Sequence, residues 1–562
     1  MKNTETFDYI SELPKPILHN ILSFLSTKDI ARTSALSKTW LDAWKTFPIL
    51  KIDLDWMLLT GVRQLPSNSE ITQKIQELYK YSEQCLLSRR SQRTNLIKFK
   101  LKVPWVYDDL EMVSNMDRWV GYALESNVKH LKIVVAATTL SEKCTYSVPP
   151  AVFNAISVQI LELRYCNLHI LPSINEVRLP FLKKLSLKCV FADDIVICKL
   201  VAGSPSIEEM SFISCYGITK LQIFNLANLV KFHVEYTHLE HLEMEAPNLH
   251  SLSLEGSSLP SVLKVVSKNL KSLAITGAPI TDAWMHEQLK RFPHLESLRL
   301  SECDMLETLK ISSYRLHRLS IKSCQGVATI QIDTPNLHVL SYCGDIISFS
   351  SNGLILPEVH LNFESNTMEI SWYARLIELL DKFNQSFRMV VLKGRTGKSY
   401  IIPSKMRRLL QPPMLKVKEL KLSINSISNE LPIALLVDAL LWISPHLESI
   451  YINCPVKSFF KCAVTKWYLR CGFTRFSYKK PIDGESRCYK SLPVSCWNHC
   501  IKDVKIKQIF RGFYYHLHGN INPNSESIER NYIFNQDIWE KIRSGVLDWN
   551  PYLDRRKSLL MT

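Results

Sequence analysis

One six-residue pattern recurs along most of this 562-residue chain and restricts its fold more than any other feature. Each copy has an apolar residue, two variable residues, a second apolar residue, one variable residue and a third apolar residue, as at Leu182, Leu185 and Leu187. The alternation in the second half of the pattern predicts a short strand with one buried face. Between Leu182 and Leu356, successive copies begin 19 to 25 residues apart. This interval predicts stacked units that share one core.

The interval falls in the range of leucine-rich repeats, about 20–29 residues. We therefore expect an α/β fold in which the strands form the parallel sheet of a curved, irregular solenoid, with the repeat domain at residues 128–365. The return segments 192–202, 260–268 and 281–292 have the apolar spacing of helices. The fifteen copies of the pattern begin at Ile49, Leu96, Val128, Val158, Leu182, Ile207, Leu229, Leu249, Leu270, Leu295, Leu316, Leu337, Leu356, Val417 and Leu447.

Residues 6–48 have a different pattern, which predicts three short amphipathic helices. Ile17 and Ile21 recur at helical spacing in the first, Asp29 places a carboxylate in the first turn of the second, and Ser37 precedes the third as a cap. A unit of about forty residues buries little apolar surface by itself. We therefore expect this unit either to dock on the rest of the chain or to offer an apolar face to a partner.

The same stretch resembles an F-box, in the form found in plant F-box proteins with leucine-rich repeats. The resemblance rests on Leu13-Pro14, Leu22-Ser23-Phe24-Leu25, Thr27-Lys28-Asp29, Thr33-Ser34-Ala35-Leu36-Ser37-Lys38 and Trp40. Thr39 stands where family members usually carry arginine. The resemblance implies that this stretch binds a Skp-family adaptor, which links it to a cullin and RING scaffold. The candidate adaptor-binding residues are Leu13, Pro14, Ile17, Ile21, Leu22, Leu25, Asp29 and Trp40.

Two further regions flank the predicted repeat domain. Residues 49–127 are expected to hold the first repeat strands and two linking helices, near 71–87 and 109–126. Residues 366–519 lose the regular interval but contain two late copies of the pattern, and their end resembles the FBD module of plant F-box proteins. The tail from 520 to 562 has no pattern that predicts a structure.

Composition and charge bear on the kinds of partner and the cellular compartment that we expect. The formal net charge of +16 suits nucleic acid, phosphate or an acidic protein surface, and charge alone does not choose among them. Because the repeats suit protein recognition, nucleic acid is not the partner we expect. The sequence has no apolar run of the length that a membrane helix needs and no apolar segment typical of a secretory signal. We therefore expect no membrane attachment, a nuclear or cytoplasmic location, and reduced thiols at the fifteen cysteines.

Four cysteines share one position in the repeat: each lies three residues after the last apolar residue of a copy. They are Cys166, Cys215, Cys303 and Cys324. At that position the chain leaves the strand, so a small side chain is expected to be buried there. The pair Cys496 and Cys500 has unusual spacing and no second ligand pair nearby, so no metal site is predicted.

The sequence offers no candidate active site and no cofactor site. Gly394 and Gly397 precede Lys398-Ser399 as in a phosphate-binding loop, but two residues separate the glycines where four are required. Between residues 388 and 421, ten Lys/Arg stand against one acidic residue. This run is either a solvated surface or a patch for an anion or acidic partner. The candidate patch residues are Lys393, Arg395, Lys398, Lys405, Arg407 and Arg408.

The F-box resemblance, together with the predicted repeats, implies a non-catalytic adaptor, the substrate-recognition subunit of an SCF-type ubiquitin ligase, with an unknown target protein bound by the repeats. Two other functions remain open: an interaction scaffold that does not join a cullin, and a receptor for a small phosphate or signalling ligand on the repeat surface. The late copies at Val417 and Leu447 predict that the solenoid continues past 365, with an apolar strand at 504–509 as its cap.

Overall fold

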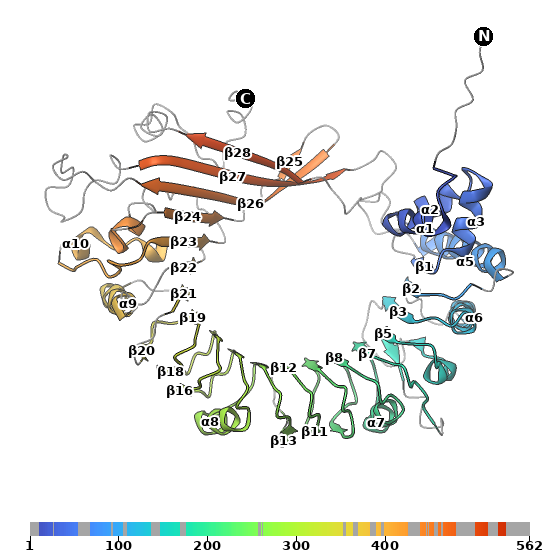
Figure 1. Cartoon of the computed structure of the whole chain (residues 1–562), viewed down its shortest axis with the longest axis horizontal. Coiled ribbons are helices and arrows are strands. Elements are labelled where there is room, and N and C mark those ends of the chain that lie inside the picture. The colour runs from blue at the N-terminus through green and yellow to red at the C-terminus, as the bar shows by residue number, and fades with distance from the viewer. Residues whose placement is uncertain are drawn as a thin grey trace, which may run out of the picture. The chain divides into compact units, whose positions relative to one another are not determined.

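The structure is a computed structural model, and it divides into two compact units, residues 1–270 and 271–562. Each unit is built on parallel strands that lie side by side, and helices or shorter strands return the chain (Figure 1). The described residues are 10–25, 27–53, 68–90, 94–104, 110–136, 146–168, 176–256, 260, 262–351, 356–363, 369–382, 389–394, 398–407, 409–424, 439–445, 447, 449–454, 459–461, 465–478, 501–514 and 527–534.

The main sheet of the first unit is parallel throughout its described strands. Its strands, in spatial order, are β1 (Ile49–Asp53), β2 (Lys98–Pro104), β3 (His130–Ala136), β5 (Ile160–Arg164), β7 (Lys184–Lys188), β8 (Glu209–Ile213), β10 (Lys231–Glu235) and β12 (Ser251–Glu255). The register aligns equivalent apolar residues of neighbouring copies, so Leu161 lies between Leu131 and Leu185, and all three are fully buried. Stacking of the copies therefore forms one continuous core within this unit.

The helices of the first unit connect these strands. They are α1 (Lys15–Phe24), α2 (Thr27–Thr33), α3 (Lys38–Thr46), α5 (Asn68–Arg90), α6 (Leu110–Glu125), the 3-10 helix η2 (Pro150–Asn154) and α7 (Asp194–Ala202). Helices α5 and α6 confirm the two predicted linking helices, and α7 confirms the helix predicted at 192–202. The Asp193 carboxylate accepts a hydrogen bond from the Val196 amide at 2.7 Å and caps α7, which ends at Gly203.

The first unit also contains two smaller parallel groups of strands. One pairs β4 (Tyr146–Ser147) with β6 (Cys166–Asn167). The other joins β9 (Lys220–Ile223), β11 (His241–Glu245) and β13 (Val262–Val266). In these repeats the segment that connects one main-sheet strand to the next contains a short strand rather than a helix. This explains why some copies of the pattern are too close together in the sequence for a helix and its loops.

A tight turn at the end of the repeat strands explains the buried cysteines. The residue after the strand has a positive φ, for example 55° at Tyr165 and 50° at Ser214. The next side chain then points inward, which buries Cys166 and Cys215, as predicted. The Ser214 amide donates to the carbonyl of Glu235 at 2.7 Å, so the turn also links neighbouring repeats. The eight cysteines whose side chains the structure describes are free thiols.

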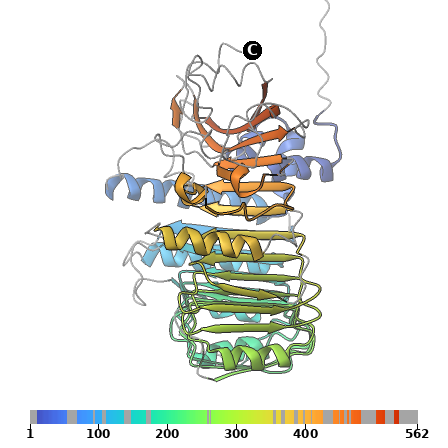
Figure 2. The same ribbon diagram turned by 90° about the vertical axis from the view of Figure 1, so that its left-hand side faces the viewer.

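The main sheet of the second unit repeats this design. Its parallel strands are β14 (Ser272–Thr276), β15 (Ser297–Ser301), β17 (Arg318–Lys322), β19 (Val339–Gly344), β21 (Glu358–Phe363), β22 (Met389–Gly394), β23 (Glu419–Ile424) and β24 (Ser449–Cys454). A smaller parallel sheet consists of β16 (Thr308–Ser312), β18 (Thr329–Asp333) and β20 (Ser348–Ser351). Its helices are α8 (Asp282–Arg291), α9 (Ile370–Lys382), the 3-10 helix η4 (Lys398–Tyr400) and α10 (Ser404–Arg407). Figure 2 shows the strands of this unit, coloured green to orange, one above another.

The C-terminal strands of the second unit change direction. Strand β24 pairs antiparallel with β26 (Thr465–Tyr478), which also pairs with β25 (Phe459–Lys461). Strand β27 (Ile501–Tyr514) lies between β26 and β28 (Ser527–Phe534), again antiparallel. The parallel pairing from β21 to β24 confirms that the repeats continue past 365, and β27 contains the strand predicted at 504–509. Strand β28 lies in the tail for which the sequence predicted no structure.

The structure corrects the position of the first repeat copy. The sequence placed its first apolar residue at Ile49, but Ile49 is half-buried, whereas Phe47, Leu50 and Ile52 have the spacing of the pattern and are buried. Because Phe47, Ile49, Leu50, Ile52 and Leu54 are all apolar, the pattern fits the sequence in two registers, which begin at Phe47 and at Ile49. The structure has the register that begins at Phe47, because the end of α3 directs Phe47 into the core.

The helix predicted at 260–268 was wrong. Residues 262–266 form strand β13, which pairs in parallel with β11, so that Leu263 lies beside Leu242. Val262, Val265 and Val266 are β-branched, and such side chains favour a strand over a helix. The helix predicted at 281–292 is confirmed as α8, where the Thr281 side chain accepts a hydrogen bond from an amide of the first turn.

Candidate functional site

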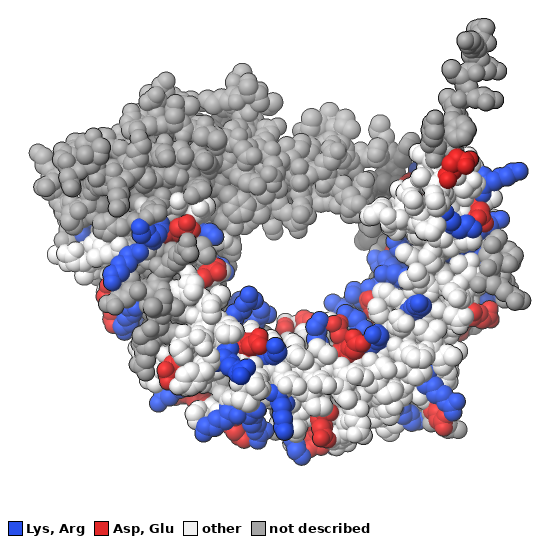
Figure 3. All heavy atoms as spheres, viewed as in Figure 1, with Lys and Arg blue, Asp and Glu red and all other residues white. Residues whose placement is uncertain are grey.

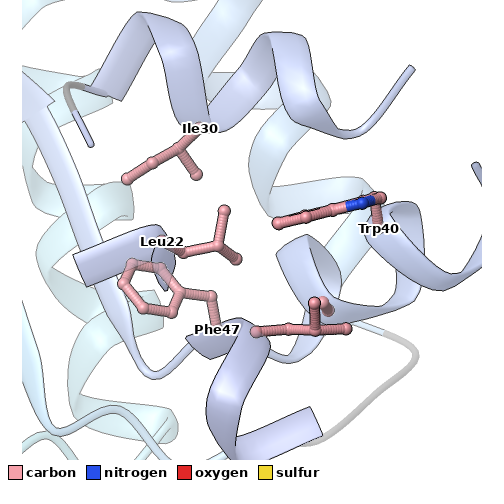
Figure 4. Packing of buried hydrophobic residues seen from close by; sticks show 6 residues of the cluster. Leu22, Ile30, Trp40 and Phe47 are labelled. Carbon is pink, nitrogen blue, oxygen red and sulfur yellow. The ribbon is translucent and has the colours of Figure 1, made fainter. Parts of the chain in front are cut away.

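The three N-terminal helices form a small domain with its own core. The buried residues Leu22, Ile30, Trp40 and Phe47 come from α1, α2, α3 and the segment after α3, and their side chains point toward one another (Figure 4). Pro14 directly precedes α1 and fixes the entry of the chain into the helix. The domain is therefore folded around its own apolar core.

Polar contacts hold α1 against α3. The His19 Nε2 atom lies 3.1 Å from both the carbonyl oxygen of Ala43 and the hydroxyl oxygen of Thr46. Burial lowers the pKa of His19, so its ring is neutral at pH 7 and the nitrogen that faces the carbonyl donates the hydrogen bond. Lys15 adds an ion pair with Asp42 at 2.6 Å, although both side chains are about half exposed. These contacts fix the angle between the two helices.

One face of α1 is apolar but exposed. Pro14, Ile17, Ile21 and Phe24 are spaced three, four and three residues apart, which places them along one side of the helix. Ile17 is 46% exposed and Phe24 is 75% exposed, whereas Ile21 is half-buried against the core. We call these four residues the α1 stripe. An exposed apolar stripe of this kind is typical of a protein-interaction surface.

The predicted adaptor-binding residues fall into three groups. Leu22 and Trp40 are core residues of the domain, 0% and 5% exposed. Four residues are half-buried. Leu13, Ile21 and Leu25 pack against the core, and Asp29 lies in the first turn of α2. Pro14 and Ile17 are exposed. The sequence prediction missed Phe24, although its seven-residue distance from Ile17 places it on the same helix face.

A buried arginine joins this small domain to the first repeats. Arg89 of α5 donates hydrogen bonds to the carbonyl oxygens of Phe47 at 2.9 Å and Trp44 at 2.7 Å, at the end of α3. Its guanidinium also lies 5.7 Å from the centre of the Trp44 ring. Carbonyls at the end of a helix have no partner within the helix, and a cation there also suits the helix dipole. Arg89 therefore fixes the small domain to the linking helix.

Replacing Arg89 with Met is expected to destabilise the first unit. Arg89 is 2% exposed, and Met fills much of its volume but leaves the carbonyls of Trp44 and Phe47 without these donors. We expect a loss of about 2–4 kcal/mol in the free energy of unfolding, measured by urea denaturation. Arg178, which is 71% exposed and paired with Glu176, provides a matched control, because Arg178→Met should change stability by less than about 0.5 kcal/mol. Equal stability of Arg89→Met and wild type would contradict this role.

Of the six residues in the basic patch predicted between 393 and 408, the structure describes three side chains. Arg395 and Arg408 lie outside the described residues, as does the side chain of Lys398. Arg407 packs inward: its Nε atom donates to the Ile402 carbonyl oxygen at 2.8 Å, and its guanidinium lies 5.9 Å from the centre of the Trp442 ring. Of the other two described residues, Lys393 is half-buried and Lys405 is exposed on α10, so the patch stays a prediction.

The described residues hold no candidate for catalysis. They contain no cluster of three His, Cys, Asp or Glu side chains that could hold a metal ion. Burial raises the pKa of Cys166 and of Cys215 to about 12, so these thiols are protonated and unreactive at pH 7. The sequence segments 395–397 and 496–500, which resembled a phosphate loop and a metal half-site, lie outside the described residues. Within the described residues, no helix has the length and apolar character to cross a membrane.

Comparison with known protein families identifies the repeats and the N-terminal domain. A family model described as At1g61320/AtMIF1, LRR domain, matches residues 87–266 and 257–454, which is more than half of the chain. The chain belongs to this leucine-rich-repeat family. An F-box domain model matches residues 10–52. The protein therefore carries an F-box domain followed by leucine-rich repeats.

Several similar proteins from Arabidopsis thaliana are F-box proteins by name, and some of these names also include leucine-rich repeats. The FBD-associated F-box protein At4g13985 is 30% identical over 267 residues, 46% of this chain and 54% of that protein. The putative F-box/LRR-repeat protein At5g02700 is 26% identical over 318 residues, 55% of this chain and 63% of that protein. The F-box/LRR-repeat protein At5g02910 is 27% identical over 379 residues, 63% of this chain and 75% of that protein. For the first two, the match thus spans less than two thirds of the relative's length.

Proposed function

We propose that this F-box/leucine-rich-repeat protein is the substrate-recognition subunit of an SCF-type ubiquitin ligase. The observation that carries the proposal is the exposed α1 stripe on a domain that is already folded around its own core. In this proposal, the α1 stripe of the F-box binds a Skp-family adaptor, which connects the chain to a cullin and RING scaffold. The repeats hold the target protein.

The proposed role needs no chemistry from this chain. A ubiquitin ligase of this type accelerates transfer by holding the target near a charged conjugating enzyme, so the advantage comes from proximity. A solenoid with an extended strand face suits the capture of a protein surface. Arg89 supports this role mechanically, since it keeps the F-box at a fixed place relative to the first repeats. Such an assembly would act in the nucleus or the cytoplasm.

Co-purification of the full chain with a purified Skp-family adaptor and a cullin tests the proposal. We expect a stable complex of all three proteins in size-exclusion chromatography. A complex with the adaptor that does not accept the cullin would instead favour the interaction scaffold. If the adaptor itself does not bind, the F-box does not have the proposed role.

A further inference from the structure

The first five strands of the main sheet in unit 1 carry an unusual concentration of positive charge on one face. Strands β1, β2, β3, β5 and β7 are neighbours in the sheet, and the residues between their buried apolar positions point to the other face. On that face, eight Lys/Arg stand against two carboxylates, Asp53 and Glu162. We call the eight cations the basic strand face: Lys51, Lys98, Lys100, Lys102, Lys132, Arg164, Lys184 and Lys188.

The strand register brings these cations together although they are far apart in the sequence. Lys51 lies beside Lys100, which lies beside Lys132, so three lysines form a row across three strands. In the next row, Arg164 lies beside Lys188. Figure 3 shows Lys and Arg side chains gathered along this part of the sheet, on the side away from α6. Neighbouring strands are about 4.8 Å apart, so the like charges lie within reach of one another.

Carboxylates neutralise only part of this charge, and one of them, Glu209 of the next strand, β8, pairs with Lys184 at 2.8 Å. Asp53 pairs with Lys100, and Glu162 accepts hydrogen bonds from Lys132 at 2.5 Å and His130 at 2.9 Å. The His130 hydrogen bond, with the help of Lys132, lowers the pKa of Glu162 to about 2, so it stays ionised at pH 7. No ion pair with a carboxylate is found for Lys98, Arg164 or Lys188 among the described residues.

The excess charge is local to these strands. Burial lowers the pKa of Lys51, and the positive charges of Lys100 and Lys98 lower it further, so the cations repel one another in the free protein. The next three strands, β8, β10 and β12, carry three carboxylates and one lysine at the equivalent positions: Glu209, Lys231, Glu235 and Glu255. An anionic partner on the basic strand face would relieve the repulsion and would be disfavoured over the following strands.

We propose that the basic strand face binds an extended acidic segment of a partner protein, several Asp or Glu residues long. This inference rests on the proposed function, because it describes the segment by which a target would be recognised. The five strands span about 19 Å at 4.8 Å per strand. An extended peptide covers this distance in about six residues. A single phosphate group spans only a fraction of that distance and would reach only a few of these cations.

The sheet geometry also defines how such a segment would bind. Strands β2, β3, β5 and β7 are paired on both sides, so their backbone groups offer no edge for an added strand. Recognition therefore comes from side chains, with partner carboxylates accepting hydrogen bonds from lysine and arginine. Charge pairs at such a half-exposed surface weaken with salt.

Fluorescence anisotropy with the full chain tests this inference. The probe is a fluorescein-labelled octapeptide, (Glu-Asp)4, and the reference is (Gln-Asn)4 of the same length. We expect salt-sensitive binding of the acidic peptide only. The triple variant Lys98→Gln, Arg164→Gln, Lys188→Gln should weaken binding about tenfold, since each lost charge pair contributes about 0.5 kcal/mol. These three side chains have no carboxylate partner within the described structure, so their replacement leaves no buried charge unpaired.

A matched variant and a competitor separate the alternatives. The triple variant Lys220→Gln, Lys264→Gln, Lys268→Gln removes the same charge at and beside β9 and β13, on exposed residues of the same unit, and should change affinity less than twofold. No binding by the wild type, or equal binding by the first triple variant, would overturn the inference. So would displacement of the peptide by tripolyphosphate at a lower concentration than by unlabelled peptide, because it would indicate a compact anion site. Adaptor binding, measured in parallel, reports separately on the proposed function.

Discussion

Replacing Ile17 and Phe24 together with Asp is expected to abolish binding of a Skp-family adaptor. Both side chains are exposed on the α1 stripe, at 46% and 75%, so the substitutions should not disturb the F-box core. Burying one large apolar side chain at an interface contributes about 1.5–3 kcal/mol, and a buried, unpaired carboxylate costs still more. The double variant should therefore bind at least about a hundredfold more weakly, as measured by calorimetry or pull-down.

A matched control comes from other helices of the same unit. Leu110 opens α6 and is 83% exposed, and Ile195 lies in the first turn of α7 and is 60% exposed. The double variant Leu110→Asp, Ile195→Asp makes the same chemical change outside the F-box and should bind the adaptor like wild type. Circular dichroism should show the same helix content for both variants. Adaptor binding that survives in the Ile17/Phe24 variant would show that the α1 stripe is not the contact surface.

The sequence predicted the F-box but could not divide its residues between core and surface. Ile17 and Leu18 are adjacent and equally apolar, yet Ile17 is exposed and Leu18 is 1% exposed. Only the positions of α2 and α3 decide which side of α1 is covered, and a helical repeat alone does not contain that information. Trp40 shows the same limit, because a domain this small has few large side chains with which to fill its core.

The repeats were predictable because their signal is local. Each copy specifies a buried strand within six residues, and the stacking follows from the repetition itself. The segments between copies were less predictable, since short returns such as β11 and β13 become strands only through pairing with each other. The sequence prediction also missed the copy at strand β22, since Phe387, Val390 and Leu392 have the spacing of the pattern. Val390 and Leu392 are fully buried in the strand that pairs with β21.

The basic run in the sequence between 388 and 421 and the basic strand face differ for a physical reason. A run of Lys and Arg in the sequence, as between 388 and 421, does not imply a patch, because Arg407 turns inward to a carbonyl and an aromatic ring. In contrast, the basic strand face gathers single residues from five strands that span positions 49 to 188. The variable positions of the pattern carry the signal, since Lys51, Lys100 and Lys132 occupy the same place in successive copies.

Ending the chain after residue 363 is expected to produce an aggregating protein. Strand β21 pairs with β22 in register, from Glu358 beside Met389 to Asn362 beside Lys393, so the truncation exposes a free strand edge. It also removes the core residues that follow, among them Leu376, Leu380, Val390 and Leu392, each fully buried. Exposed edges and apolar repeat ends favour association between copies.

Light scattering coupled to size-exclusion chromatography and a thermal melt measure this effect. A chain that ends after residue 534 is the control, because it retains every described strand and should behave like the full chain. The physical reason for the difference is that strands β22 to β24 continue the same parallel sheet, so the C-terminal region completes the repeat core rather than standing beside it. A fragment ending at residue 363 that is monomeric and as heat-stable as the full chain would show that the C-terminal region folds as a separate domain.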